Sequence, residues 1–334
     1  MSRIAILGAG SWGTGLSVVL SCSRRKHEIR LWARDASLAD SIERDRENKK
    51  YLPGISVPPC VKACSTLDNV LHEAQIVIAA VPSAHTRSIF ALALHFMSRD
   101  AVFLSATKGL EPATHLRMSE VISQVLNARF VPSLAVLSGP SFAAEAAEGQ
   151  PTAVVLACKD AALGAYLQEE LSGPTFRLYT NDDVLGVELA GAMKNVMAIA
   201  AGACQGLGLG ANSLAALITR SLAEMTRLVA VLGGKPETLS GLAGMGDLIL
   251  TCYGAQSRNR RVGFELGQGR SLHEILAGMT MVAEGVGTTA ALLALAKENH
   301  IELPVTQQVH SILHLGNSPR EAIRAIMERP LKRE

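Results

Sequence analysis

Short apolar runs alternate with helical patterns through the first half of the chain. Six of these runs are aliphatic on both faces, which is typical of strands in a parallel sheet that helices cover on both sides. A seventh, extended piece closes this half. We therefore predict strands at Ile4–Leu7, Ile29–Trp32, Ile76–Val81, Val102–Ser105, Leu134–Leu137, Ala153–Ala157 and Thr175–Tyr179.

The pattern changes near residue 181, and no further strand is predicted beyond it. Val184–Ala201 has the composition of one long helix, and Ser213–Leu232 repeats its apolar residues with a helical period. Ser271-x-x-Glu274 and Ser318-Pro319-Arg320-Glu321 are capping boxes that begin two more helices. We therefore expect an α/β domain with a mostly parallel sheet over residues 1–181, followed by an all-α domain over residues 182–334.

Length and composition agree with two globular domains. The chain has 334 residues, and domains contain about 150 residues each. Its 32 Lys and Arg against 30 Asp and Glu leave a net charge of +2, whereas a dedicated nucleic-acid binder is usually far more basic. Only 4% of the residues are aromatic, too few for a base-stacking surface. No nucleic-acid partner is therefore predicted.

Neither a membrane span nor a secretory leader is predicted. The longest weakly polar stretch, Val184–Gly202, contains Glu188 and Lys194, whereas a membrane helix needs about 20 apolar residues with few charges. The first apolar run, Ile4–Leu7, is too short for a signal peptide. Six scattered cysteines form no CxxC pair and suit reduced thiols, so we expect a cytoplasmic protein.

Residues Gly8–Gly13 have the spacing GxGxxG, directly after the predicted strand Ile4–Leu7 and before an amphipathic segment. In that context Gly8 allows a tight turn, Gly10 leaves room for a pyrophosphate, and Gly13 lets the helix pack on the strand. Free N–H groups at a helix start bind anionic oxygen. We therefore predict a Rossmann-like dinucleotide site here, in preference to an ordinary glycine-rich turn.

The end of the second strand bears on the choice of cofactor. An NAD site usually has an acid about 20 residues after the glycines, where it binds the ribose 2′-hydroxyl. Arg34 stands nearest that position, and a cation there suits the 2′-phosphate of NADP. Asp35 follows it directly, and Arg34 could also be a solvated charge at a strand end, so both NADP(H) and NAD(H) are kept as cofactors.

Other predicted strands also end in polar residues. Ligands of open α/β sheets bind beyond the carboxyl ends of the strands. Lys108 and Gly139-Pro140-Ser141 follow two strands, and Val81-Pro82-Ser83 ends a third. Pro82 and Gly139 suit simple turns, whereas Lys108 is a cation after a buried strand and is harder to explain without a function.

The helical half contains two further candidate sites. Lys194 stands in an apolar helix, where a buried cation is costly unless it is paired or functional. If Lys194 has a structural role, its partner is Glu188 on the same helix. If Lys194 has a functional role, its partner is Asp247, which follows two glycines. The polar run Ser257–Arg261 suits a phosphate or a carboxylate, with an exposed loop as the alternative. No metal-binding motif is present in the sequence, so no metal is predicted.

Taken in order, these segments are similar to the bacterial NAD(P)-dependent glycerol-3-phosphate dehydrogenase family. The stretch from Gly191 to Asn212 resembles the family signature, except that Ala203 replaces a larger aliphatic residue and Gln205 an acid. The match runs over nearly the whole chain, through Gly8–Gly13, Val81-Pro82-Ser83, Ala106-Thr107-Lys108-Gly109, Ser138-Gly139-Pro140-Ser141, Gly191–Asn195, Gly244–Asp247 and Ser257-Arg258-Asn259.

The resemblance implies a homodimer that interconverts dihydroxyacetone phosphate and sn-glycerol 3-phosphate, which supplies phospholipid synthesis. It implies that Lys194 donates and accepts the proton, with Asp247 beside it, and that Lys108 lies where cofactor and substrate meet. The other implied cofactor contacts are Ser11, Trp12, Arg34, Ala143, Arg258, Val282 and Glu284. The other implied substrate contacts are Gly139, Ser141, Ser257, Arg258 and Asn259.

Two other functions remain open on the residues alone. Another two-domain dehydrogenase would act on a hydroxyacid, with Arg258 as the partner of its carboxylate. A non-catalytic dinucleotide sensor would use Gly8–Gly13 but would have no use for Lys108, Lys194 and Asp247. The chemistry favours the enzyme, because a lysine can protonate the oxygen of a reduced ketone without a metal.

Overall fold

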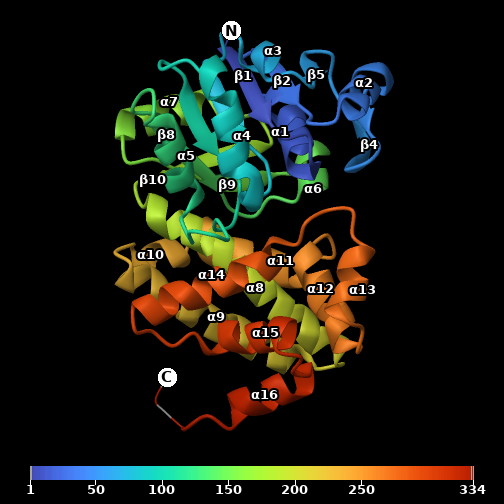
Figure 1. The fold of residues 1–334 in the computed structure, drawn as a ribbon, viewed down its shortest axis with the longest axis vertical. Coiled ribbons are helices and arrows are strands. Elements are labelled where there is room, and N and C mark those ends of the chain that lie inside the picture. The colour runs from blue at the N-terminus through green and yellow to red at the C-terminus, as the bar shows by residue number, and fades with distance from the viewer. Residues whose placement is uncertain (1, 332, 334) are drawn as a thin grey trace. The chain divides into compact units, whose positions relative to one another are not determined.

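The chain folds into two compact units, in a computed structural model that describes residues 2–331 and 333. The N-terminal unit contains the chain up to Lys108 and Leu116–Glu188, and the C-terminal unit contains Gly109–His115 and the chain from Leu189 onward. Figure 1 shows the course of the chain through both units. The sequence pattern places the boundary between residues 181 and 182, where the last strand ends, whereas the contacts divide the chain within the helix that follows.

The N-terminal unit is built on one eight-stranded sheet with the order β10-β9-β8-β7-β6-β1-β2-β5. All neighbouring strands are parallel except β8 and β9, so the prediction of a mostly parallel sheet is confirmed. The strands are β1 (Ser2–Leu7), β2 (His27–Trp32), β5 (Val61–Cys64), β6 (Ile76–Ala79), β7 (Val102–Ser105), β8 (Ser133–Ser138), β9 (Thr152–Ala157) and β10 (Phe176–Asn181).

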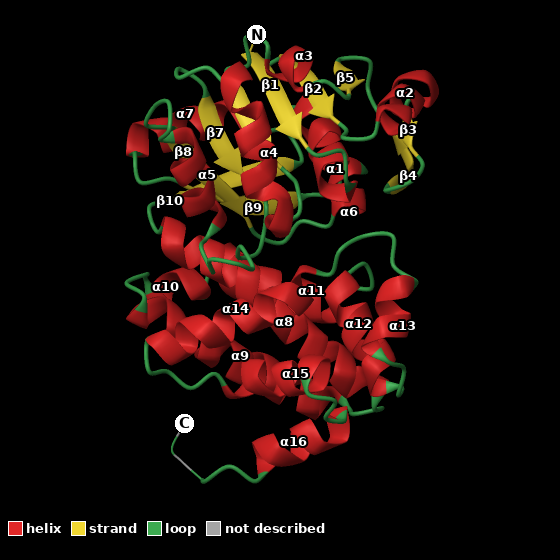
Figure 2. Ribbon diagram, viewed as in Figure 1, coloured by secondary structure: helices red, strands yellow, loops and turns green. Residues whose placement is uncertain are grey.

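Helices cover both faces of this sheet (Figure 2) and form two separate hydrophobic cores with it. Successive side chains of a strand point to opposite faces. Ile4 and Ile6 therefore pack in one core, while Ala5 and Leu7 pack in the other. The helices are α1 (Ser11–Ser21), α2 (Ala36–Asp45), α3 (Leu67–Leu71), α4 (Thr86–Ala93), α5 (Met118–Leu126), α6 (Ala143–Ala147) and α7 (Ala161–Leu171).

Three strands were not predicted from the sequence. The edge strand β5 contains the exposed Lys62, so it lacks the two apolar faces that marked the other strands. A small antiparallel pair is formed by β3 (Glu47–Asn48), which is two residues long, and β4 (Leu52–Ser56), which contains a proline and a glycine. Such short or edge strands leave little hydrophobic pattern in a sequence.

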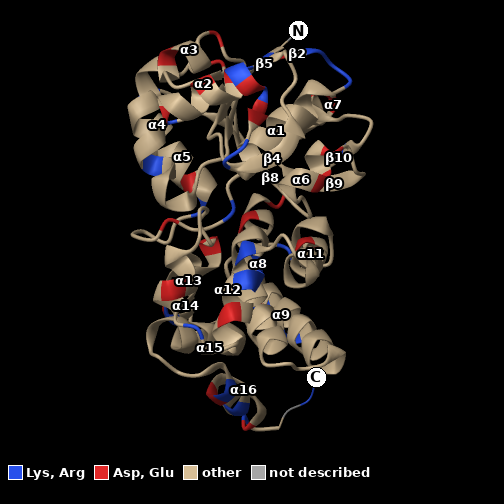
Figure 3. Ribbon diagram, turned by 90° about the vertical axis from the view of Figure 1, so that its right-hand side faces the viewer, with Lys and Arg blue, Asp and Glu red and all other residues tan. Residues whose placement is uncertain are grey.

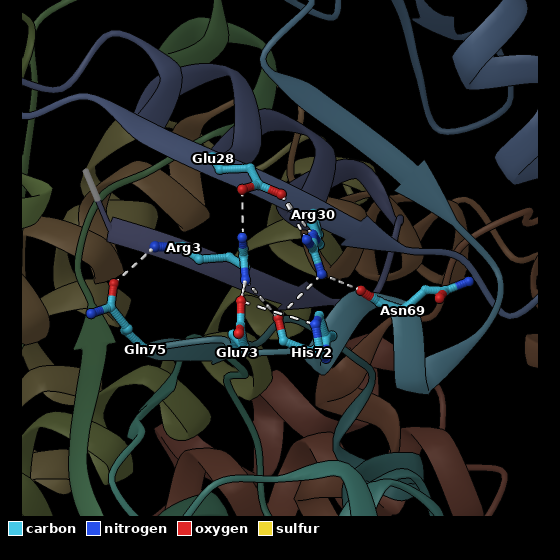
Figure 4. A network of polar contacts seen from close by, with 7 residues as sticks. All are labelled: Arg3, Glu28, Arg30, Asn69, His72, Glu73 and Gln75. Carbon is cyan, nitrogen blue, oxygen red and sulfur yellow. Dashed lines mark hydrogen bonds and ion pairs between the residues drawn. The ribbon is translucent and has the colours of Figure 1, made fainter.

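A network of charged residues joins β1, β2 and the end of α3 (Figure 4). Arg3 Nε donates to Glu28 Oε2 at 3.0 Å, and Arg30 Nε donates to Glu28 Oε1 at 2.9 Å. Both guanidinium groups also donate to the carbonyl oxygen of His72. The hydrogen bonds from Arg30 and Arg3 lower the pKa of Glu28. Because Arg3 and Glu28 are register partners on neighbouring strands, the network strengthens the β1–β2 pair.

The regular elements that the structure describes beyond β10 are all helical, as the sequence predicts. Ser271 and Ser318 cap their helices through the predicted capping boxes, and α16 mixes charges of both signs (Figure 3). The helices are α8 (Val184–Gly206), α9 (Ala211–Val231), α10 (Pro236–Leu239), α11 (Asp247–Tyr253), α12 (Arg258–Gly267), α13 (Leu272–Ala277), α14 (Glu284–Glu298), α15 (Pro304–His314) and α16 (Pro319–Met327).

Helix α8 is mostly apolar and mostly buried. It is long and apolar enough to cross a membrane by length and composition, but 89% of its most apolar stretch is buried inside the protein. Such burial is typical of a core helix.

Glycines let α8 and α12 approach each other at backbone distance. A Cβ added to Gly202 would lie 1.9 Å from the carbonyl oxygen of Arg260, and one added to Gly263 would lie 1.9 Å from that of Ile199. A Cβ added to Gly206 would lie 2.2 Å from the carbonyl oxygen of Phe264, and one added to Gly267 would lie 2.6 Å from that of Ala203. This contact matters for the site because Lys194 lies on α8 and Ser257-Arg258-Asn259 lie at the start of α12.

We predict that Gly263→Ala destabilises the protein by about 1–3 kcal/mol or more, because the backbone of α8 cannot move away from the new methyl group. The matched control is Gly287→Ala on α14, where an added Cβ meets nothing within 4 Å. That control should be neutral or stabilising by about 0.5–1 kcal/mol, since alanine favours helix. Thermal and urea unfolding of both variants measure the difference, and equal effects would contradict the backbone contact.

Candidate active site

The GxGxxG turn leads from β1 into α1, and each of its glycines has a different reason to be glycine. Gly8 has a φ of +117°, and an added Cβ would lie 2.6 Å from the carbonyl oxygen of Ala80. A Cβ on Gly13 would lie 1.8 Å from the carbonyl oxygen of Gly8, so α1 packs directly on the turn. At Gly10 an added Cβ meets nothing within 4 Å, so this protein itself does not require glycine there. A ligand that approaches the backbone would explain it.

Helix α1 begins at Ser11 without a side-chain cap. Its N-cap residue is Gly10, and no acidic residue lies in its first turn. The first N–H groups of a helix have no partner within the helix, and the helix dipole favours negative charge there. The start of α1, with Ser11, Trp12 and Gly13, therefore fits the pyrophosphate of a dinucleotide.

At the end of β2, Arg34 and Asp35 have different environments. The Asp35 carboxylate caps α2, accepting from Ser37 N at 3.0 Å and from Ser37 Oγ at 2.8 Å. These hydrogen bonds lower the pKa of Asp35. Arg34 is exposed, and none of the residues that the structure describes hydrogen-bonds or ion-pairs with its side chain. The acid is thus engaged locally, while the guanidinium is available to a ligand.

The loops after β7 and β8 bring three of the candidate residues together. Lys108 Nζ donates to the carbonyl oxygen of Gly139 at 2.7 Å, and Ser141 Oγ donates to the same oxygen at 2.9 Å. Gly139 has a φ of +133°, a conformation that favours glycine. Ala143 begins α6, and its carbonyl oxygen would lie 2.9 Å from a Cβ on Gly15 of α1. These residues lie at the carboxyl edge of the parallel strands, where α/β sheets bind ligands.

In the C-terminal unit, Lys194 pairs with Asp247. The ammonium nitrogen lies 2.5 Å from Asp247 Oδ1 and 2.9 Å from Thr251 Oγ1. The exposed fraction is 9% for the Lys194 side chain and 0% for that of Asp247. Thr251 Oγ1 also lies within hydrogen-bond distance of the backbone oxygen of Asp247, at 2.6 Å. The Lys194 ammonium group is therefore buried, and Asp247 and Thr251 fix its orientation.

The alternative prediction, an ion pair between Lys194 and Glu188, is wrong. Glu188 accepts from Ser119 N at 2.8 Å and from Arg117 Nη1 at 2.9 Å, and so caps the start of α5. Burial raises the pKa of Glu188, and the charge of Arg117 opposes that rise. Helical spacing on α8 suggested the pair, but the packing of α8 turns the two side chains to different neighbours.

Asn259 belongs to a chain of amide hydrogen bonds across three helices. Its Nδ2 donates to Asn195 Oδ1 at 2.9 Å, and its Oδ1 accepts from the backbone N–H of Gly285 at 2.9 Å. Asn195 in turn donates to the carbonyl oxygen of Gly191. One N–H of Asn259 remains beyond these bonds, since a primary amide has two.

The start of α12 gathers the remaining candidates. Ser257 caps the helix, with its hydroxyl oxygen accepting from Arg260 N at 3.2 Å. Arg258 Nη1 donates to the carbonyl oxygen of Val282 at 2.7 Å. Burial lowers the pKa of Arg258, and the charge of Glu284 opposes that lowering. The structure thus brings Arg258, Val282 and Glu284 together next to a helix N-terminus, which favours an anion.

Two residues near Lys194 were missed by reasoning from the sequence. Thr251 lies four residues after Asp247 on α11, so the helical spacing i, i+4 was the available signal. Asn195 was noticed only as the neighbour of Lys194, and its bond to Asn259 depends on helix packing. A π-helical turn over Leu242–Gly246 precedes Asp247, and such turns are frequent at functional sites.

The two departures from the family signature lie away from the Lys194 ammonium. Gln205 Oε1 accepts from Arg260 Nε at 2.6 Å and so joins α8 to α12. Ala203 is buried.

Next to the Lys194 pair, burial raises the pKa of Cys252 to about 12, so its thiol is neutral. Among the described residues, no group of three His, Cys, Asp or Glu side chains could hold a metal.

A glycine-rich turn on a parallel sheet and a buried ammonium group in a helical unit define a dehydrogenase of the two-domain type. The model of the NAD-dependent glycerol-3-phosphate dehydrogenase N-terminus matches residues 3–164. The model of the NAD-dependent glycerol-3-phosphate dehydrogenase C-terminus matches residues 183–324. This chain therefore belongs to the NAD-dependent glycerol-3-phosphate dehydrogenase family.

Individual relatives agree with this family. A glycerol-3-phosphate dehydrogenase [NAD(P)+] of Koribacter versatilis is 54% identical over 99% of this chain and 98% of its own length. Another from Acidobacterium capsulatum is 53% identical over 99% of both chains. The crystal structure of glycerol-3-phosphate dehydrogenase from Coxiella burnetii has a TM-score of 0.92 and 42% identity, over 98% of this chain and 99% of that one.

Proposed function

We propose that this protein reduces dihydroxyacetone phosphate to sn-glycerol 3-phosphate, and catalyses the reverse reaction, with NADP(H) or NAD(H). The observation that carries the proposal is the buried Lys194–Asp247 pair, 2.5 Å between its nitrogen and oxygen, in a chain of this family. Reduction of the ketone creates an oxygen that needs a proton, and an oriented ammonium group can donate it.

The N-terminal unit holds the dinucleotide. The uncapped start of α1 binds the pyrophosphate through the N–H groups of Ser11 and Trp12, and Gly10 leaves the space for it. Arg34 binds the adenosine ribose, including the 2′-phosphate of NADPH. When bound, the reduced nicotinamide supplies the hydride that is added to the ketone carbon.

Lys194 protonates the ketone oxygen and takes the proton back in the reverse direction. Asp247 and Thr251 hold its ammonium group at a fixed position, because both lie on α11 and within 2.9 Å of the nitrogen. Asp247 stabilises the charged form of the lysine, whereas burial disfavours it. A positioned proton donor of this kind accounts for a rate factor of about 10²–10⁴.

The start of α12 binds the substrate phosphate. The helix N-terminus and the Arg258 guanidinium supply positive charge, and Ser257 and the free N–H of Asn259 supply further donors. Arg258 also reaches the cofactor, together with Val282 and Glu284. The substrate also contacts Lys108, Gly139 and Ser141. The cofactor contacts Lys108 and Ala143.

One assay tests this function against its two rivals. Purified protein is mixed with NADPH or NADH and dihydroxyacetone phosphate, and the loss of reduced cofactor is followed by absorbance. A panel of 2-oxo acids serves as alternative substrates for a hydroxyacid dehydrogenase. Faster turnover of an oxo acid would favour that rival, and binding without any turnover would favour a dinucleotide sensor.

We predict that Arg34→Ala raises the Kd for NADPH and leaves the Kd for NADH nearly unchanged. Losing a charge-assisted contact to an exposed phosphate costs about 1.5–3 kcal/mol, or roughly tenfold to a hundredfold in Kd. Titration of protein fluorescence with each cofactor measures the two constants. Arg44→Ala is the control, because Arg44 is also exposed and pairs with Asp45 instead. An equal loss for both cofactors would contradict the proposed role of Arg34.

The family resemblance also supports a homodimer in the cytoplasm that supplies phospholipid synthesis. All six cysteines are free thiols, as suits a reducing compartment. Sedimentation velocity across a range of protein concentrations tests the dimer. Depletion of the protein in cells tests whether it supplies phospholipid synthesis. If it does, added glycerol 3-phosphate should restore phospholipid synthesis in the depleted cells.

A further inference from the structure

Asn48 is a fully buried polar residue that sequence reasoning did not single out. Its exposed fraction is 0%, and all of its side-chain hydrogen-bonding groups are engaged. Nδ2 donates to the carbonyl oxygen of Ala9 at 2.9 Å and to Thr14 Oγ1 at 2.8 Å, while Oδ1 accepts from Tyr51 N at 3.1 Å. A buried amide whose groups are all satisfied holds its neighbours in one arrangement.

The two partners of the Asn48 amide nitrogen belong to the glycine-rich turn and the helix it starts. Ala9 lies between Gly8 and Gly10, and Thr14 lies in the first turn of α1 with its own N–H bonded to the carbonyl oxygen of Gly10 at 3.0 Å. Asn48 comes from β3, more than thirty residues away in the sequence. It therefore anchors the turn from outside.

The bond to Ala9 also sets the direction of the next N–H group. The carbonyl oxygen of Ala9 and the N–H of Gly10 belong to one planar trans peptide, in which they point in opposite directions. Fixing this oxygen on Asn48 therefore turns the Gly10 N–H away from Asn48. Glycines are the residues with the most freedom to lose, so a turn that contains Gly8 and Gly10 needs such an anchor.

We propose that Asn48 is a positioning residue for the dinucleotide, acting through the glycine-rich turn. It holds the peptide between Ala9 and Gly10 in the orientation that presents the N–H of Gly10 and the start of α1 to the pyrophosphate. This inference rests on the proposed binding of a dinucleotide by the N-terminal unit. It differs from a purely structural role, in which Asn48 only ties β3 to α1.

The test compares Asn48→Ala with Thr14→Val. Asn48→Ala removes the bond to Ala9, so it should raise the Kd for NADH and NADPH alike by about tenfold, the effect of one lost hydrogen bond and a carbonyl left without its partner. Thr14→Val removes only the other acceptor of Asn48 and keeps the bond to Ala9. It should lower the melting temperature while leaving both Kd values near those of the wild type.

Fluorescence titrations at a temperature where each variant is folded give the Kd values, and the KM for dihydroxyacetone phosphate at saturating cofactor is the second readout. That KM should not change in either variant. Unchanged cofactor Kd values in a folded Asn48→Ala protein would overturn the inference, as would equal losses in Thr14→Val. Wild-type protein that binds neither dinucleotide would overturn the proposed function, and this inference with it.

Asn48→Asp carries the test if Asn48→Ala does not fold. Its ionised carboxylate still accepts from Tyr51 N but offers no proton to Ala9, whereas the protonated acid can donate one. Cofactor binding by this variant, relative to the wild type, should therefore strengthen as the pH falls. A relative affinity that does not depend on pH would contradict the role of the Ala9 bond.

Discussion

Lys194→Met should lower kcat by about 10²–10⁴-fold while cofactor binding stays near that of the wild type. The reason is that the variant keeps the length and apolar bulk of the side chain but removes the proton donor. Steady-state kinetics with dihydroxyacetone phosphate and NADPH measure kcat, and fluorescence titration measures the Kd for NADPH. Lys297→Met on α14 is the control, because Lys297 is an exposed lysine whose loss should leave kcat unchanged.

The Lys194 variant needs a separate check of stability. Asp247 is fully buried, so removing its partner leaves an uncompensated charge, which typically costs about 3–5 kcal/mol. The double variant Lys194→Met/Asp247→Asn removes that charge and should regain stability without regaining kcat. A small exogenous amine should restore part of the activity of Lys194→Ala. Turnover near the wild-type value in a folded Lys194→Met protein would contradict the assignment, and Lys108 would become the next candidate acid.

Arg258→Ala should raise the KM for dihydroxyacetone phosphate by a factor of about 30 or more. Removing a charge-assisted contact to a buried anion costs about 2–5 kcal/mol, and each 1.4 kcal/mol corresponds to about tenfold. Initial rates at saturating NADPH measure this KM. Arg261→Ala is the control, since Arg261 lies on the same helix but pairs with Glu265. An unchanged KM in the Arg258 variant would move the phosphate site away from the start of α12.

Asn259→Ala is a less direct test of the substrate-phosphate site than Arg258→Ala. Its amide joins Asn195 on α8 to the backbone of Gly285 on α14, so truncation also loosens the helices around Lys194. A rise in substrate KM in that variant therefore has to be compared with its melting temperature. Arg258 gives the clearer result because its hydrogen bond to the carbonyl oxygen of Val282 lies near the surface.

The fold was accessible from the sequence because its signals are local. Six runs that are apolar on both faces and one further extended piece were predicted as strands, and all seven lie in the sheet. Gly8–Gly13 is equally local, since a strand, a tight turn and a helix start follow each other directly. The capping boxes at Ser271 and Ser318 depend on three residues of spacing and were also predictable.

The partners of the buried polar groups were decided by the tertiary structure. Lys194 had two candidate partners in the sequence, and the packing of α8 against α11 selected Asp247, 53 residues away, over Glu188 on its own helix. Asp35 became a helix cap, which left Arg34 available at the end of β2.

Asn48 left no signal in the sequence, because β3 is two residues long and its hydrogen bonds cross to the glycine-rich turn. The hydrophobic pattern of this chain determines which segments are strands and helices, since burial of one or two faces repeats along each element. The choice of a hydrogen-bond partner depends on where two elements meet in space, and for these residues only the packed units supply that information.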